Sequence, residues 1–214
     1  MIIKEQKIPV QRTGVFYEAG NLVGSRVTWF TCHGYGQLSE NMIKKFDEVV
    51  VRGHSVICVE GLNRFYWQGV TGQPVATWMT KRFRFDEIKD NNNYLSNIYE
   101  KIDSEKKRIL LGFSQGGTTM WRWIHEKRPD FDVFINYAGW MPEDIDLSVL
   151  SDYLKDKKLI FVHGDKDEYL TKERIEAFNE VLTRSTLDVE FLSFDGAHKI
   201  ERSVLNEVID KFKL

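Results

Sequence analysis

Short apolar runs alternate with longer amphipathic segments along most of the chain. The short runs are rich in Val, Ile, Leu and Phe, as is typical of buried strands, and they lie at residues 8–17, 27–32, 55–59, 108–111, 132–137, 157–162 and 189–194. The longer segments have the spacing of apolar residues expected for amphipathic helices, and they lie at residues 39–52, 85–103, 118–127, 171–184 and 199–212. The pattern therefore predicts strands that alternate with helices.

Three features refine this pattern. Residues 8–17 and 27–32 are joined by the turn-prone stretch Glu18-Ala19-Gly20-Asn21, so we expect the two strands to form an antiparallel pair. Ser39 is expected to be the N-cap of the first helix. Residues 60–81 form a long connection rich in aromatic side chains, and a loop of this kind in a compact domain is usually functional.

The alternation predicts an α/β protein with a mostly parallel sheet and helices on both faces. The later strands are separated by helices, as is typical of parallel strands, and the first two add an antiparallel N-terminal pair. The length of 214 residues suits one domain, and no repeat or linker divides it, so we expect residues 1–214 to form a single domain.

Composition and charge exclude several classes of function. Hydrophobic residues make up 42% of the chain and charged residues 29%, which indicates a globular protein. The net charge of -2 gives no reason to expect nucleic acid as a partner or a stable association with membranes. The first residues carry charges where a secretory signal needs an apolar run, so we expect a cytoplasmic protein. Cys32 and Cys58 lie in strand-like runs and are expected to be buried free thiols.

One motif carries a specific chemistry. Gly112-Phe113-Ser114-Gln115-Gly116-Gly117 follows a predicted buried strand and precedes a predicted helix. A Ser with Gly two residues away on each side, at a strand-to-helix turn, is the pattern of a nucleophile elbow. The turn is sharp, and side chains at Gly112 or Gly116 would collide with the neighbouring backbone. Ser114 is therefore the candidate nucleophile.

Candidate partners follow Ser114 in the chain. Functional groups of open α/β sheets gather at the carboxyl ends of the strands, and Asp165, Asp167 and His198 each follow such an end. The order Ser, acid, His is that of the triad of α/β hydrolases. His198 is the candidate base, because a Ser hydroxyl needs a nearby group that takes and returns its proton.

The acid is less sharply defined than the base. Asp165 is well placed to close its own turn, whereas Asp167 lies further along the loop, where it can reach toward His198; we therefore favour Asp167. Asp195 lies so close to His198 in sequence that it is expected to shape that turn. The remaining histidines are weaker candidates for the base, and they are His33, His54, His125 and His163.

An acyl transfer also needs donors for the developing oxyanion. The N–H after the nucleophile, that of Gln115, is one candidate. The loop after the second strand supplies the other, and Tyr35, which follows His33-Gly34, is the candidate there. Both would act through the backbone. No metal or organic cofactor is needed for this chemistry.

The motifs around Ser114, His33-Gly34-Tyr35-Gly36 and His163-Gly164-Asp165-Lys166-Asp167 resemble those of the phospholipase/carboxylesterase family of α/β hydrolases. That family includes small bacterial carboxylesterases and acyl-protein thioesterases. The resemblance implies the α/β-hydrolase fold, with Ser114 as nucleophile, Asp167 as acid and His198 as base. It also implies that Tyr35 and Gln115 donate to the oxyanion.

The sequence therefore predicts a serine carboxylesterase that acts on small-molecule esters through an acyl-enzyme. Trp67, Trp78, Met79 and Trp140 are candidates for the substrate pocket, although those of the 60–81 connection would equally well pin it to the core. Acyl-protein thioesterase or lysophospholipase activity, a binding protein without catalysis, and a metal hydrolase built on His33, His163 and Asp165 are the alternatives. The oligomeric state is not predicted, and a homodimer stays open.

Overall fold

A twisted sheet forms the centre of the protein. The computed structural model describes residues 1–214. The sheet contains, in spatial order, β1 (Phe16–Ala19), β3 (Ser55–Val59), β2 (Val27–Cys32), β6 (Lys107–Phe113), β7 (Val133–Tyr137), β8 (Lys158–Gly164) and β9 (Val189–Phe194). All neighbouring strands are parallel except β1 and β3, which are antiparallel. The predicted α/β-hydrolase fold, a mostly parallel sheet with helices on both faces and one antiparallel strand pair, is confirmed.

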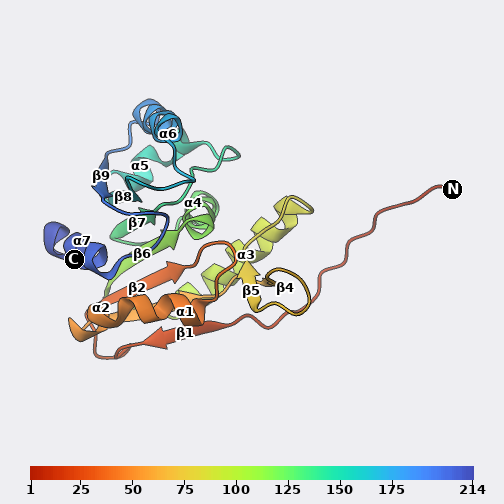
Figure 1. Ribbon diagram of the computed structural model, residues 1–214, viewed down its shortest axis with the longest axis horizontal. Coiled ribbons are helices and arrows are strands. Elements are labelled where there is room, and N and C mark those ends of the chain that lie inside the picture. Colours follow the sequence, from red (N-terminus) through yellow and green to blue (C-terminus); the bar gives the residue numbers. More distant parts are fainter.

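Helices cover both faces of this sheet (Figure 1). One face carries α1 (Ser39–Ile43), the 3-10 turn η1 (Lys44–Phe46), α2 (Asp47–Val51) and α7 (Arg202–Phe212). The other carries α3 (Arg84–Tyr99), α4 (Gln115–Lys127) and α6 (Lys172–Arg184). Two short turns, η2 (Leu147–Leu150) and α5 (Ser151–Leu154), precede β8.

Alternation along β2 shows how the strand residues serve both helical layers. Trp29 packs against Phe46 of η1, with ring centroids 6.0 Å apart, and the next residue, Phe30, packs against Trp123 of α4, at 5.5 Å. Successive side chains of a strand point to opposite faces. A strand that is covered on both faces therefore has no polar face, which explains the continuous apolar runs in the sequence.

The N-terminal prediction was partly wrong. The expected strand at residues 8–17 is reduced to β1, and β1 pairs with β3 rather than with β2, because β2 lies inside the sheet between β3 and β6. Residues 1–15 form no strand, and the chain before β1 extends away from the body (Figure 1). Near its junction with β1, Tyr94 of α3 donates a hydrogen bond to the carbonyl oxygen of Val15 at 2.7 Å.

Two further expectations need correction. The helix expected at residues 39–52 is interrupted by η1, and its N-cap is Leu38 rather than Ser39. Ser39 is instead the first helical residue, and its buried hydroxyl donates to Glu60 at 3.0 Å. The long connection at residues 60–81 contains an antiparallel hairpin of β4 (Asn63–Tyr66) and β5 (Pro74–Thr77), which lies beside the main sheet and near α3 (Figure 1).

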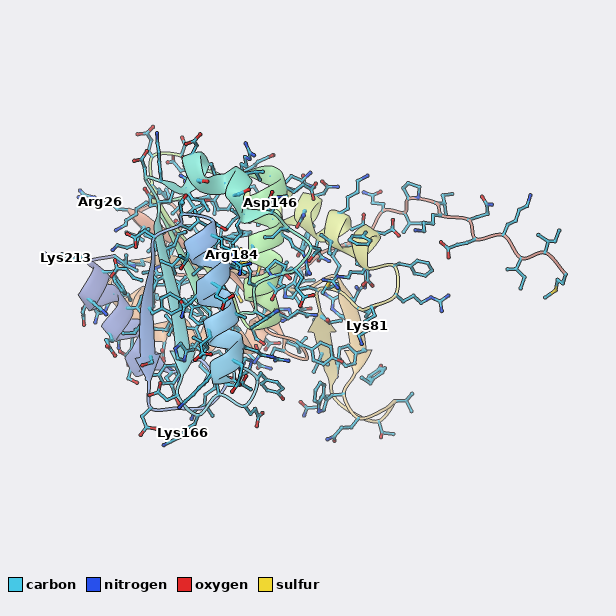
Figure 2. All side chains as sticks on the ribbon, turned by 90° about the horizontal axis from the view of Figure 1, so that it is seen from above. Arg26, Lys81, Asp146, Lys166, Arg184 and Lys213 are labelled. Atoms are coloured by element: carbon cyan, nitrogen blue, oxygen red, sulfur yellow. The ribbon has the colours of Figure 1, made fainter.

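The later elements agree with the prediction to within a few residues, and β3 and β9 match it at both ends. Cys32 and Cys58 are buried and free, as expected. None of the helices is both long and apolar enough to cross a membrane. The carboxyl ends of β2, β6, β7 and β8 lie at one edge of the sheet, which Lys166 marks in Figure 2.

Candidate active site

Ser114 occupies the turn between β6 and α4 in a strained backbone conformation. Its φ is 53° and its ψ is -120°, a region that residues with side chains rarely adopt. The N–H of Ser114 donates to the Tyr137 carbonyl oxygen of β7 at 2.9 Å, which anchors the turn to the neighbouring strand. The turn therefore presents the Ser114 hydroxyl at the carboxyl edge of the sheet.

The glycines on each side allow this turn. A Cβ on Gly112 would lie 2.5 Å from the Cα of Gly117, and a Cβ on Gly116 would lie 2.2 Å from the carbonyl oxygen of Cys32. Distances this short are not tolerated between carbon and backbone atoms. A side chain at Gly112 would therefore collide with helix α4, and a side chain at Gly116 would collide with strand β2, as predicted.

Ser114, His198 and Asp167 form one chain of hydrogen bonds. The Ser114 hydroxyl oxygen lies 2.8 Å from Nε2 of His198, and Nδ1 of the same ring lies 2.6 Å from Oδ2 of Asp167. An ionised carboxylate only accepts, so Nδ1 carries the proton and Nε2 is left to accept from the hydroxyl. The arrangement is that of a nucleophile, a base and an orienting acid.

The loop after β8 presents Asp167 for this contact. Its side chain is fully buried, and Oδ1 accepts from the N–H groups of Tyr169 and Leu170 at 2.8 and 3.1 Å. The ring of Tyr169 also packs edge-on against the His198 ring, with centroids 4.8 Å apart. Both oxygens of the carboxylate are therefore held, one by the loop and the other by His198.

The other acids and histidines considered from the sequence lie elsewhere. Asp195 forms an ion pair with Lys166, and Asp165 makes no contact with His198. His54 accepts a hydrogen bond from Trp29, and His163 lies beside Phe161 in β8. No group of three or more His, Cys, Asp or Glu side chains is placed to hold a metal ion, which includes the set of His33, His163 and Asp165.

The loop after β2 lies directly against Ser114. A Cβ on Gly34 would come within 3.2 Å of the Cβ of Ser114. The N–H of Gly34 donates to the side-chain oxygen of Gln37 at 3.0 Å, and the N–H of Gly36 donates to the Ala76 carbonyl oxygen at 3.0 Å. The peptide of Tyr35 is thus fixed on both sides. The N–H of Gln115 is the first of α4 and has no acceptor within the helix.

The sequence matches the model of a known family over most of its length. The matching family is described as serine hydrolase (FSH1), and the match covers residues 30–205. The chain belongs to this serine hydrolase family. The matched region contains Ser114, Asp167 and His198. A search of curated protein sequences finds no significant match.

Solved structures of other hydrolases share the fold. The structure of acyl-protein thioesterase 2 from Zea mays has a TM-score of 0.72 at 15% identity, covering 94% of this chain and 98% of the other. Esterase PE8 gives 0.70 at 15% identity, over 94% and 99% of the two chains. The Bacillus cereus carboxylesterase gives 0.68 at 14% identity, over 94% and 93%. These neighbours are of the kinds that the motif resemblance implied.

A cavity of about 390 Å³ opens at Ser114 and His198 of the hydrolase. Met79 and Trp140, two of the four predicted pocket residues, line it. Ala138, Thr118 and Tyr169 add to its wall. This cavity also contains charged residues that the sequence analysis did not connect with the site, and they are Arg84, Arg122, Glu143 and Arg174.

Trp67 and Trp78, the other two predicted pocket residues, do not line this cavity. Trp78 is buried, and its indole N–H donates to the His33 carbonyl oxygen at 2.8 Å. Trp67 is 44% exposed on the hairpin and packs against the ring of Tyr35, with centroids 5.9 Å apart. Both side chains support the loop that carries Tyr35, which is the pinning role weighed against a pocket in the sequence analysis.

The side chain of Gln115 has a role that its backbone position did not predict. Its Oε1 accepts from the Thr77 hydroxyl at 2.9 Å and from the Trp78 N–H at 3.1 Å, and its Nε2 donates to the Met79 carbonyl oxygen at 3.1 Å. The residue after the nucleophile therefore ties the 77–79 segment to the elbow. No periodicity in the sequence indicates such a bond.

We expect Gln115→Ala to lower the free energy of unfolding by about 1–3 kcal/mol, because it leaves the part-buried N–H of Trp78 without a partner and removes the bonds to Thr77 and Met79. Urea unfolding of the purified protein measures this change. Gln11→Ala is the matched control, because Gln11 is exposed and makes no side-chain hydrogen bond. Equal stability of Gln115→Ala and the wild type would show that these hydrogen bonds contribute nothing.

His33 holds the same loop from inside. Its ring is fully buried, Nδ1 donates to the Gly34 carbonyl oxygen at 2.7 Å, and Nε2 accepts from the N–H of Gly61 at 2.9 Å. Burial lowers the pKa of His33 to about 4, although the Gly34 carbonyl and Glu60 oppose the shift. His33 is therefore neutral and structural, and it fixes the backbone on either side of the active-site loop.

This buried imidazole predicts a pH dependence of stability. The unfolded state binds the proton near pH 6.5 and the folded state only near pH 4, so stability is lost as the pH falls between these values. We expect the free energy of unfolding to be about 2 kcal/mol lower at pH 5 than at pH 7. Urea unfolding at the two pH values checks this. His33→Asn should lose most of the difference, whatever its stability, and an unchanged difference would exclude His33 as the cause.

Proposed function

We propose that this serine hydrolase is a carboxylesterase that hydrolyses small carboxylic esters through an acyl-enzyme on Ser114. The observation that carries the proposal is the unbroken chain of hydrogen bonds from Ser114 through His198 to Asp167. It lies at the mouth of a cavity of about 390 Å³, a volume in the range of small-molecule sites. Membership of the serine hydrolase family also supports Ser114 as the nucleophile.

In the first half of the reaction, the Ser114 oxygen forms a bond to the ester carbonyl carbon while its proton passes to Nε2 of His198. The bond from that carbon to the alcohol oxygen then breaks, and the proton on Nε2 passes to the departing alcohol. Asp167 remains ionised throughout. It holds Nδ1–H and stabilises the imidazolium that forms.

In the second half, water replaces the alcohol. His198 takes a proton from the water as its oxygen attacks the acyl carbon, and the same proton returns to Ser114 as the acid leaves. In both halves, the N–H groups of Gln115 and Tyr35 are proposed to donate to the oxyanion. The fixed amides of Gly34 and Gly36 hold the peptide of Tyr35 in place for this role.

A panel of aryl and alkyl esters with acyl chains of increasing length tests the proposal, with thioesters of the same acids beside them. We expect turnover of short-chain esters and a fall in kcat/KM for long chains, because the cavity is small. A preference for long-chain thioesters or lysophospholipids would favour the alternative activities. Absence of turnover with all of them would favour a binding protein. The cytoplasmic location stays a prediction.

A further inference from the structure

The cavity beside Ser114 has an unusual electrostatic character for a site that would bind only neutral esters. Three arginines line it, Arg84, Arg122 and Arg174, and Glu143 is the single carboxylate among the lining residues. Cavities for neutral ligands are mostly apolar, with few charged groups. The balance of these charges decides whether the arginines hold the fold or face a ligand.

Asp144 accounts for one of the three guanidinium groups. Both oxygens of Asp144 accept from Nε of Arg122 at 3.0 and 3.1 Å, and Oδ1 also accepts from Nη2 at 2.6 Å. Burial opposes ionisation of Asp144, but the hydrogen bonds and charge of Arg122 keep the pKa of the carboxyl below its usual range. The Arg122 side chain is only 4% exposed, so this pair is structural.

Arg84 shares the same carboxylate. Its Nη2 lies 3.1 Å from Oδ1 of Asp144, while its Nε is buried and has no hydrogen-bond partner. One carboxylate therefore serves two guanidinium groups. A buried donor without an acceptor is costly, so Arg84 retains a capacity to bind an anionic group that the protein does not use.

Arg174 has no carboxylate partner at all. Its Nη1 donates to the Tyr169 carbonyl oxygen at 2.6 Å, and its guanidinium lies over the ring of Trp140, 5.4 Å from the centroid. These contacts orient the group without neutralising it, as stacking on an aromatic face does. The same Tyr169 packs against His198, so Arg174 is held close to the catalytic chain.

The sum of these contacts leaves positive charge in the cavity. Three guanidinium groups are accompanied by only two carboxylates, Asp144 and Glu143, and both oxygens of the nearby Asp167 already accept hydrogen bonds. Glu143 forms no ion pair with any of the arginines, whose polar contacts are instead Asp144 for Arg84 and Arg122 and the Tyr169 carbonyl for Arg174. A carboxylate is the ligand whose planar geometry matches a guanidinium fork.

We propose that the substrate of this esterase carries a free carboxylate, which Arg174 binds at the wall of the Ser114 cavity. The inference rests on the proposed esterase function and narrows its substrate class to half-esters of dicarboxylic acids or esters of hydroxy acids. In the first case the carboxylate lies on the acyl part, and in the second it lies on the alcohol part. Arg174 is then the residue that determines specificity.

Kinetics with matched substrates test the proposal. Monoethyl esters of succinic, glutaric and adipic acid are compared with the corresponding ethyl ester amides, in which a primary amide of the same length and no charge replaces the free carboxylate. Acetyl glycolate is compared with acetyl glycolamide, so that the two arms show which part of the substrate carries the carboxylate. We expect a preference of about tenfold in kcat/KM for the carboxylate in at least one arm. High salt should reduce this preference.

Variants assign the preference to the cavity. Arg174→Gln should bring the ratio of the two kcat/KM values close to one, and Glu143→Gln should increase it. Arg184→Gln is the matched control: Arg184 is exposed at the opposite end of α6, far from the carboxyl edge (Figure 2), and it pairs with Glu180. A ratio that Arg174→Gln leaves unchanged, or a wild-type preference for the uncharged amides, would overturn the proposal.

Binding without turnover separates this inference from the esterase proposal. In the Ser114→Ala variant, glutarate should raise Tm in a phosphate-free buffer, and adding Arg174→Gln should remove the shift. A shift that depends on Arg174, in a protein that hydrolyses none of the esters, would support the carboxylate site and reject the esterase. Hydrolysis of neutral esters without any such shift would support the esterase and reject the carboxylate site.

Discussion

Ser114→Ala is expected to lower kcat for small esters by about 10⁴-fold or more while the fold is retained. Without the hydroxyl, no acyl-enzyme forms, and only binding and oxyanion donors remain to assist attack by water. The stability of the variant should change little, because the Ser114 hydroxyl bonds only to His198. The measurement is steady-state hydrolysis of a short-chain aryl ester, with urea unfolding to check the fold.

Ser104→Ala is the control for this variant, because Ser104 is exposed in the turn before β6, away from the carboxyl edge. It should retain the wild-type rate. Wild-type hydrolysis by a folded Ser114→Ala protein would mean that another group performs the chemistry.

Asp167→Asn is expected to lower kcat by about 10³–10⁴-fold with a small change in KM. An amide presents an NH₂ group to the ring, so the imidazole no longer needs its proton on Nδ1, and Nε2 loses its role as acceptor from Ser114. The loop amides of Tyr169 and Leu170 also lose a charged acceptor, so a moderate loss of stability accompanies the loss of rate.

Asp165→Asn is the matched control, because it makes the same change two residues earlier in the same loop. Asp165 is exposed and makes no contact with His198. We expect that variant to keep most of the wild-type rate. If Asp165→Asn lost activity and Asp167→Asn did not, the assignment of the acid would be reversed.

The parts of the fold that depend on buried strands could be predicted from the sequence. A strand covered on both faces is buried throughout, and for this reason residues 27–32 and 55–59 could be predicted with their observed bounds. The prediction for residues 8–17 was wrong for a different reason, because apolar residues alone do not show whether a segment has a strand to pair with. Ile8 and Val10 are exposed, and pairing begins only at Phe16.

The arrangement around Ser114 could be predicted because the elbow imposes its own sequence. Any side chain at Gly112 or Gly116 would collide with Gly117 or Cys32, so both positions have to be glycine, and the two glycines can be recognised in the sequence. The order of the parallel strands then brings the loops with Asp167 and His198 to the same edge. These constraints are local or topological, and each can be recognised from a short segment of the sequence.

The rest of the site depends on contacts between distant segments, which leave no local pattern. The Gln115 side chain bonds to residues nearly forty positions earlier, and Arg122 of α4 pairs with Asp144 of the loop after β7. In the sequence, Arg174 is only one of several charged residues in the helix predicted at residues 171–184. Its stacking on Trp140 depends on the placement of α6 against the loop after β7, and no motif records that placement.

The central claim is that Ser114 is the acylated nucleophile, and covalent labelling tests it most directly. The wild-type protein is treated with a fluorophosphonate, digested, and examined by tandem mass spectrometry to locate the modified residue. We predict one adduct, on Ser114, that forms much more slowly in a His198→Gln variant and is slowed when an excess of ester substrate is present during the labelling. An adduct on another residue, or no adduct in protein that hydrolyses esters, would contradict the account.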